Sequence, residues 1–161
     1  MHKVVVNATP IISLCHIDQL HLLKKLYGEI LIPEAVYYEI SAKHDSITKE
    51  EIDKSLDWVH VCRISNELAR DFFKSQLHAG EVEVMILGKE VEATLLIIDD
   101  KNAKRHAKYL QFAVTGTLGV LLKAKKEGYI RAVKPLIEKL FFNGIFLDDR
   151  IIAFCLEQAG E

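Results

Sequence analysis

The sequence predicts an α/β domain over residues 1–161, a three-layer sandwich in which helices cover both faces of a five-stranded parallel sheet. Short apolar runs alternate along the chain with longer segments that repeat apolar residues at helical spacing, a pattern typical of α/β folds. Except for His60 in the run 58–62, the short runs are apolar, as expected of parallel strands buried on both faces. A length of 161 residues corresponds to one domain.

The predicted strands are short, and charged or turn-forming residues bound them. They lie at residues 4–6, 30–32, 58–62, 95–98 and 112–114. Helices are predicted at about residues 9–17, 18–27, 33–40, 48–56, 65–73, 79–87, 101–110, 120–127, 135–140 and 149–158. The helices in about residues 129–161 follow the last strand and form the C-terminal part of the domain.

Residues that can satisfy free backbone N–H groups mark several helix starts. Such capping residues are predicted at Thr9, Thr48, Ser65 and either Asp148 or Asp149. Thr48 stands three residues before Glu51, which is the spacing of a capping box. Pro10, Pro33 and Pro135 each suit the first turn of a helix.

Composition describes an ordinary globular chain. Half of the residues are apolar and 27% are charged, with a formal net charge of −2, so bulk charge does not indicate a nucleic-acid partner. Cys15, Cys62 and Cys155 lie far apart in apolar surroundings, which favours buried free thiols in a reducing compartment. No signal peptide opens the chain and no apolar run reaches the length of a membrane span. We therefore expect a cytoplasmic protein without membrane contact.

Two adjacent carboxylates, Asp99 and Asp100, follow the buried run 95–98 and precede a helix. One of them could simply cap that helix, but a cap does not need two. In an open parallel sheet, ligands bind outside the carboxyl ends of the strands. Two carboxylates at that edge repel each other unless a cation or hydrogen-bond donors compensate.

Other polar residues are expected at or near the same edge. Together with the aspartate pair, the set is Asn7, Glu39, Glu81, Asp99 and Asp100. Hard divalent cations such as Mg²⁺ and Mn²⁺ prefer carboxylate, amide and water oxygens. A bound ion of this kind activates water and stabilises charge on a phosphodiester. The set therefore suggests metal-assisted phosphodiester hydrolysis.

Three further features admit both a functional and a structural interpretation. Glu83 could act as an additional ligand or only complement the dipole of its helix. A basic stripe at helical spacing could contact phosphates or form a solvated face. It consists of Lys101, Lys104, Arg105 and Lys108. The turn 115–119 contains two glycines and could cradle phosphate, but it lacks the lysine of a P-loop, which favours a packing turn.

Four motifs in order resemble the PIN-domain family. They are VVVNATPIIS at 4–13, IPEAVYYEI at 32–40, GEVE at 80–83 and the pair at 99–100. By this resemblance Glu39, Glu81 and Asp100 match three of the family's acids, and Asn7 stands where the first acid is expected. The segment from Thr115 to Lys125 and residues 159–161 resemble a subfamily of toxin-like proteins.

The resemblance implies a Mg²⁺- or Mn²⁺-dependent endoribonuclease, with RNA as substrate. It also implies a toxin role beside a small antitoxin protein, and a homodimer. Thr9 matches the family's small hydroxyl residue, which positions a metal-bound water or an acidic side chain. Asn7 can still ligate a cation through its carbonyl oxygen but brings no charge, so metal affinity should be weaker.

Two other functions remain open on the sequence. A PIN-fold module with weakened catalysis that binds RNA or a protein is favoured by Asn7. A phosphoacceptor domain would use the aspartate pair, but such domains place acids after the first strand, where this chain has Asn7.

Overall fold

The computed structural model describes residues 2–73 and 77–161, and it confirms an α/β fold with a five-stranded parallel sheet. Within these residues the strands lie where the sequence predicts them, with small shifts at their ends. They are β1 (Val4–Val6), β2 (Ile30–Pro33), β3 (Val59–Cys62), β4 (Leu95–Ile97) and β5 (Val114–Thr115). Their order in the sheet is β3-β2-β1-β4-β5, and every pair is parallel.

The middle strand, β1, lies between β2 and β4. Val5 pairs with Leu31 on one side and with Leu96 on the other. Val5 is fully buried, as expected of a β-branched residue in a strand with both faces covered. The residues that follow β1 and β4 therefore lie side by side at one edge of the sheet.

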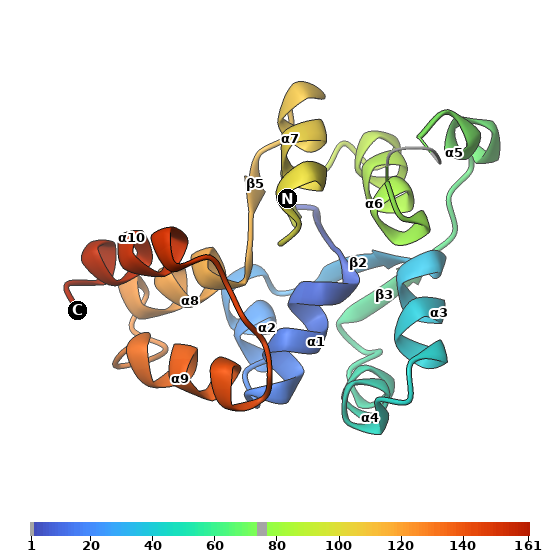
Figure 1. Cartoon of the computed structure of the whole chain (residues 1–161). Coiled ribbons are helices and arrows are strands. Elements are labelled where there is room, and N and C mark those ends of the chain that lie inside the picture. Colours follow the sequence, from blue (N-terminus) through green and yellow to red (C-terminus); the bar gives the residue numbers. More distant parts are fainter. Residues whose placement is uncertain (1, 74–76) are drawn as a thin grey trace.

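Helices cover both faces of the sheet (Figure 1). In the described part of the chain they are α1 (Ala8–His16), α2 (His21–Tyr27), α3 (Glu34–Ala42), α4 (Ser46–Lys54), α5 (Glu67–Phe73), α6 (Ala79–Glu90), α7 (Lys101–Tyr109), α8 (Thr117–Lys126), α9 (Lys134–Phe142) and α10 (Asp149–Ala159). α5, α6 and α7 lie on one face, and α1, α2 and α8 lie on the other (Figure 1). Right-handed crossovers produce this distribution, because the chain runs outward from β1 to β3 and then returns to β4 and β5.

Three helices begin with other capping residues than predicted: α4 and α5, and α1, which is described with the site. The N-cap of α4 is Asp45, whose carboxylate accepts hydrogen bonds from the N–H and the hydroxyl of Thr48 at 3.1 and 2.8 Å. A carboxylate is a stronger acceptor for these groups than a hydroxyl, and its charge complements the helix dipole. Before α5, Asn66 rather than Ser65 accepts a bond from the N–H of Ala69, at 3.2 Å.

The last strand is displaced from its predicted position. β5 covers residues 114–115, whereas the apolar run lies at 112–114. Gln111 has a φ of +66°, so the chain turns sharply before Phe112. The ring of Phe112 then packs against Gly88 of α6, where an added methyl group would lie 3.0 Å from it. Phe112 thus packs on a helix instead of joining the sheet.

The structure also tests two expectations from composition, that the cysteines are buried free thiols and that no segment is long and apolar enough to span a membrane. Cys15 and Cys155 are buried free thiols, as predicted, and Cys62 is half-buried. Burial raises the pKa of the Cys15 thiol to about 12. Among the described residues, no helix combines the length and the apolar character that a membrane span requires.

The cap of the C-terminal helix α10 is Asp148, one of the two aspartates predicted for it, and it accepts a bond from the N–H of Arg150. Its apolar side chains divide between the core and solvent. Ile152 and Leu156 pack against the core, whereas Ile151 and Phe154 are 47% and 61% exposed.

Glu161 connects the end of α10 to the start of α9 through hydrogen bonds. Its carboxylate accepts bonds from the N–H groups of Val133 and Lys134 at 2.8 and 3.0 Å, and Lys125 Nζ lies 2.9 Å away. These donors lower the pKa of the Glu161 carboxyl to about 2. They stabilise the ionised form, so the contact depends on pH.

We expect Glu161→Gln to lower the denaturant midpoint at neutral pH and to have little effect near pH 2. The ordinary pKa of 4.5 is higher than the folded-state value of about 2. The contribution is therefore present above pH 4.5 and is lost as the pH falls through 2. Glu157→Gln, an exposed acid on the same helix, is the control. A midpoint difference that does not shrink in acid would contradict this account.

Candidate metal and nuclease site

The sheet has a topological switch between β1 and β4, since the chain fills one side of β1 first and then the other. Such switch points are the usual ligand sites of open parallel sheets. Asn7 directly follows β1, and Asp99 and Asp100 follow β4 after Ile98. The N–H of Asn7 donates to the carbonyl of Ile97 at 3.0 Å, which fixes the two strand ends together.

Gly80, in the first turn of α6, lies against two of the predicted site residues. A methyl group added at Gly80 would be 3.4 Å from Glu39 Oε1 and 3.5 Å from Asn7 Oδ1. Asn7 itself is only 6% exposed, so its side chain is buried beside Gly80. Sequence reasoning did not select Gly80, although its place directly before Glu81 could have indicated a close approach.

Glu81 is the buried acid of the site, with 7% of its surface exposed. Burial raises the pKa of the Glu81 carboxyl, and the negative charges of Asp100 and Glu39 raise it further, whereas His78 lowers it. Asp100, Glu39 and Glu81 therefore lie within electrostatic reach of one another. Ionised Glu81 is unfavourable in this environment until a cation or a proton arrives.

The two adjacent aspartates have different partners. Asp100 is the N-cap of α7, and its Oδ2 accepts a bond from the N–H of Ala103 at 2.8 Å. Asp100 is exposed, whereas Asp99 is half-buried. Both oxygens of Asp99 accept bonds from Thr117 at the start of α8: the N–H donates at 2.7 Å and the hydroxyl at 2.6 Å. Asp99 thus caps a helix that begins 18 residues later.

The glycine turn before α8 is packed tightly. A methyl group at Gly116 would lie 2.7 Å from Asp99 Oδ1 and 2.8 Å from Lys104 Nζ, and one at Gly119 would lie 1.9 Å from Thr115 Oγ1. The first N–H of the helix is already used by Asp99. This geometry supports the packing interpretation of the turn over a phosphate cradle.

Glu83 points away from Glu81, as residues two apart on a helix do. It is 6% exposed, and its Oε1 accepts a bond from the N–H of Ala35 at 3.3 Å. Its Oε2 lies 3.4 Å from Arg70 Nη2. These contacts connect α6 to α3 and α5. The role of Glu83 as an additional metal ligand stays a prediction.

Thr9 lies in the first turn of α1, so the prediction that Thr9 is the N-cap of this helix is wrong. The N-cap of α1 is Asn7, whose extended backbone starts the helix without a side-chain hydrogen bond. Thr9 follows two residues later with its side chain exposed. Its role in positioning water or an acid stays a prediction.

The basic stripe lies on α7, directly after the aspartate pair. Lys101, Arg105 and Lys108 are exposed, and Lys104 is half-buried. Lys104 turns toward Gly116 and lines a cavity of about 210 Å³ together with Asp99 and Ile151. Lys101, Arg105 and Lys108 are thus accessible from solvent.

The donor set of this site suits a hard divalent cation. Its atoms are the carboxylate oxygens of Glu39, Glu81 and Asp100 and the amide oxygen of Asn7, without a sulfur or an imidazole among them. Glu39 Oε1 and Asn7 Oδ1 both lie near Gly80, and the charges of Asp100 and Glu39 act on Glu81, so these residues lie in the same region. Within residues 2–73 and 77–161, no three His, Cys, Asp or Glu side chains are close enough to enclose an ion already.

Residues 3–161 match the sequence model of a family of PIN domains, DUF3368. The match covers nearly the whole chain and includes Asn7, Glu39, Glu81 and the aspartate pair. No curated protein matches the sequence.

Proposed function

Because the chain belongs to the PIN-domain family, we propose that it is an endoribonuclease that hydrolyses RNA phosphodiesters with Mg²⁺ or Mn²⁺ as cofactor. PIN domains are typically nucleases that use divalent metal ions. The observation that carries the proposal is the environment of Glu81, a buried carboxylate beside the charges of Asp100 and Glu39. Such repulsion costs stability, and a divalent cation among the three acids would remove it.

We assign a separate role in metal binding or water positioning to each residue of the site. Glu39, Glu81 and Asp100 hold the ion, and Asn7 adds a neutral oxygen. When bound, the ion lowers the pKa of a water molecule and stabilises charge on the phosphodiester. The hydroxyl of Thr9 orients a metal-bound water or an acidic side chain.

Asp99 completes the set that the sequence predicts for catalysis and metal binding. Through Thr117 it fixes α8 against the end of β4. The position of the adjacent Asp100 depends on that connection. We propose that this positioning is the main contribution of Asp99.

Calorimetric titration of Mn²⁺ tests the proposed function. We expect the wild type to bind Mn²⁺, and Asp100→Asn and Glu39→Gln each to lose binding, because each removes one charge and keeps the side-chain shape. Asn is as good an N-cap as Asp, so the start of α7 should persist in Asp100→Asn. The control is Asp148→Asn, another exposed N-cap aspartate, on α10; it should bind like the wild type.

Failure of the wild type to bind at millimolar Mn²⁺ would contradict the nuclease proposal. It would favour the second candidate function, a PIN-fold module that binds RNA or a protein without cleaving it. Asn7 is the observation that favours this alternative, because it replaces a charged ligand with a neutral one. Binding that persists in both variants would place the metal elsewhere.

The exposed cations of α7 are proposed to hold the RNA backbone. We expect the triple charge reversal of Lys101, Arg105 and Lys108 to glutamate to weaken RNA binding and to flatten its salt dependence. Each lost phosphate contact should reduce the slope of log K against log salt by about 0.7 for single strands. Fluorescence anisotropy with a labelled oligoribonucleotide at several salt concentrations measures both effects.

A matched control reverses three exposed cations on other helices, Lys54, Lys139 and Arg150. This variant has the same net charge as the α7 variant. Equal weakening by both variants would mean that the α7 stripe acts only through bulk charge.

The finer biological role that we propose is that of a cytoplasmic toxin, with a small antitoxin protein and a second copy of the chain as partners. Exposed aromatic side chains near the C-terminus support a protein partner: Phe142, Phe146 and Phe154 are 91%, 75% and 61% exposed. Apolar surface of this kind is typical of interaction sites. Light scattering of the purified protein measures the oligomer.

A further inference from the structure

Helix α7 carries a tyrosine beside its exposed cations. Tyr109, the last residue of the helix, is 86% exposed. Successive residues of a helix are turned by about 100°, so Tyr109 and the three exposed cations of α7 fall within an arc of roughly 100°. The buried residues Ala103 and Ala107 lie on the opposite side. Tyr109 and the exposed cations therefore share one solvent face, which we call the outer face of α7.

The ring of Tyr109 is not engaged by another side chain. Among residues 2–73 and 77–161, no hydrogen bond, ring contact or lysine ammonium involves it. Tyr27, Tyr37 and Tyr129 differ in this respect, because a lysine ammonium lies 4.7, 5.0 and 5.5 Å from their ring centroids. Both faces of the Tyr109 ring are thus available to a ligand.

The backbone that carries Tyr109 is held against α6. Lys89 Nζ donates to the carbonyl of Leu110 at 2.8 Å, and the N–H of Phe112 donates to the carbonyl of Ala107 at 3.0 Å. The Phe112 ring in turn packs against Gly88 of α6. A ligand that covers the Tyr109 ring therefore has to order only the few torsions of one side chain, which keeps the entropic cost of binding low.

The charges around the outer face favour a polyanion. The sequence contains no Asp or Glu between Asp100 and Glu127. The exposed cations of α7 attract phosphate groups, and the ring of Tyr109 adds a flat apolar surface beside them. Proteins that hold single nucleic-acid strands combine these two features, a cationic track for the backbone and an aromatic ring for a base.

The outer face begins at the proposed metal site, because the N-cap of α7 is Asp100. Tyr109 lies nine residues further on, which corresponds to about 13 Å along the helix axis at roughly 1.5 Å per residue. Stacked nucleotides are spaced at roughly 3.4 Å. A strand that follows the outer face from the acids thus reaches Tyr109 within about four nucleotides.

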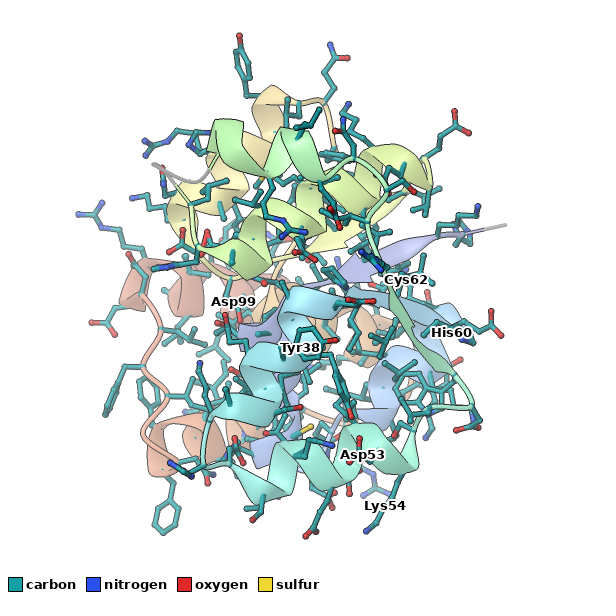
Figure 2. All side chains as sticks on the ribbon, turned by 90° about the vertical axis from the view of Figure 1, so that its right-hand side faces the viewer. Tyr38, Asp53, Lys54, His60, Cys62 and Asp99 are labelled. Carbon is teal, nitrogen blue, oxygen red and sulfur yellow. The ribbon has the colours of Figure 1, made fainter. Side chains whose placement is uncertain are left out.

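A second exposed tyrosine lies in surroundings of the opposite charge. Figure 2 shows Tyr38 on α3, where it is 61% exposed. Its ring already contacts that of Tyr37, with centroids 6.2 Å apart. Tyr38 also lines a cavity of about 260 Å³ whose lining contains three glutamates and two arginines. The excess of negative charge repels phosphate, so Tyr38 is not placed to hold an RNA strand.

We propose that Tyr109 stacks on a base of the RNA substrate and so sets the register in which the strand crosses the metal site. The exposed cations of α7 hold phosphates, and Tyr109 holds a base within about four nucleotides of the bond that is cleaved. Because every base has a face that can stack, this contact positions the strand without reading its sequence. The inference rests on the proposed ribonuclease function, which supplies RNA as the ligand.

The test measures binding of a labelled single-stranded oligoribonucleotide to the full chain in EDTA, by fluorescence anisotropy. Tyr109→Ala should weaken binding roughly 5- to 150-fold, the usual loss for one stacked base. The slope of log K against log salt should stay unchanged, because no phosphate contact is lost. Tyr109→Trp keeps a ring that can stack and should retain binding. The control Tyr38→Ala removes another exposed tyrosine and should bind like the wild type.

Two further measurements separate stacking from a general apolar contact. Tyr109→Leu keeps an apolar side chain but has no flat ring, so it should lose as much affinity as Tyr109→Ala. A blunt RNA duplex keeps its bases stacked on one another, so its binding should not change in Tyr109→Ala. Full single-strand affinity in Tyr109→Ala or Tyr109→Leu, or an equal loss for the duplex, would overturn the proposal.

The outcome is distinguishable from that of the proposed function, because RNA binding is measured without metal. If the wild type binds Mn²⁺ but Tyr109→Ala binds RNA normally, the nuclease proposal stands and the role of Tyr109 is wrong. If Tyr109→Ala loses RNA binding and the wild type does not bind Mn²⁺, Tyr109 is a contact of an RNA-binding module that does not cleave.

Discussion

Replacing Glu81 with glutamine should abolish Mn²⁺ binding and, at the same time, raise the melting temperature of the metal-free protein. Glutamine keeps the shape of the buried side chain and removes a charge that burial, Asp100 and Glu39 all make unfavourable. Each kcal/mol gained should raise the melting temperature by about 2–4 °C in a chain of this size. Calorimetry in EDTA and in Mn²⁺ measures both effects.

The gain should depend on pH in a defined direction. The folded-state pKa of Glu81 is raised above the ordinary value of 4.5, so the folded protein holds this proton more tightly than the unfolded chain. Glu81 favours folding below pH 4.5, and that contribution is lost as the pH rises through the folded-state pKa. The advantage of Glu81→Gln should therefore be largest at neutral pH and absent at pH 4.5 or below.

Glu83→Gln is the matched control for this result. Glu83 lies two residues further along α6 and is equally buried, but its oxygens are satisfied by Ala35 and Arg70. Removing its charge should lower stability by about 1–2 kcal/mol and leave Mn²⁺ binding intact. If both substitutions raise stability, then removing either buried charge is stabilising, and the effect at Glu81 does not depend on the neighbouring charges of Asp100 and Glu39.

Replacing Asp99 with alanine should destabilise the protein by about 2–4 kcal/mol, more than any other change at this edge of the sheet. Thr117 is fully buried, and both its N–H and its hydroxyl donate to Asp99. Alanine leaves two buried donors without acceptors. Asp100→Ala removes one bond at an exposed helix start and should cost only about 0.5–1 kcal/mol. Urea unfolding measures both.

A double-mutant cycle separates the contact with Thr117 from other effects of Asp99. Thr117→Val removes the hydroxyl, and its cost should fall when residue 99 is already alanine, with a coupling of about 0.5–3 kcal/mol. Mn²⁺ binding to Asp99→Asn decides the metal role that the sequence predicts for this residue. Additive costs would show that the two residues do not support each other.

Apolar runs locate the three central strands, β1, β2 and β4, because a parallel strand buried on both faces has few polar positions to obscure it. The edge strand β5 is less predictable, since its apolar run lies two residues earlier. Chain order then places Asn7 and Asp100 at one edge, since β1 and β4 are neighbours across the switch point. Local caps are less predictable. Thr48 is a good capping residue by itself, but Asp45, three residues earlier, takes its N–H and hydroxyl.

The sequence by itself therefore determined the fold class and the edge at which the acids gather. Only the tertiary structure decided between neighbouring acids: Asp99 is held by Thr117, 18 residues away, and Glu83 by Ala35, 48 residues away. Glu81 instead lies against Asp100 and Glu39 from other elements. The physical reason is that a carboxylate's role depends on which donors and charges surround it, and those come from segments distant in the chain.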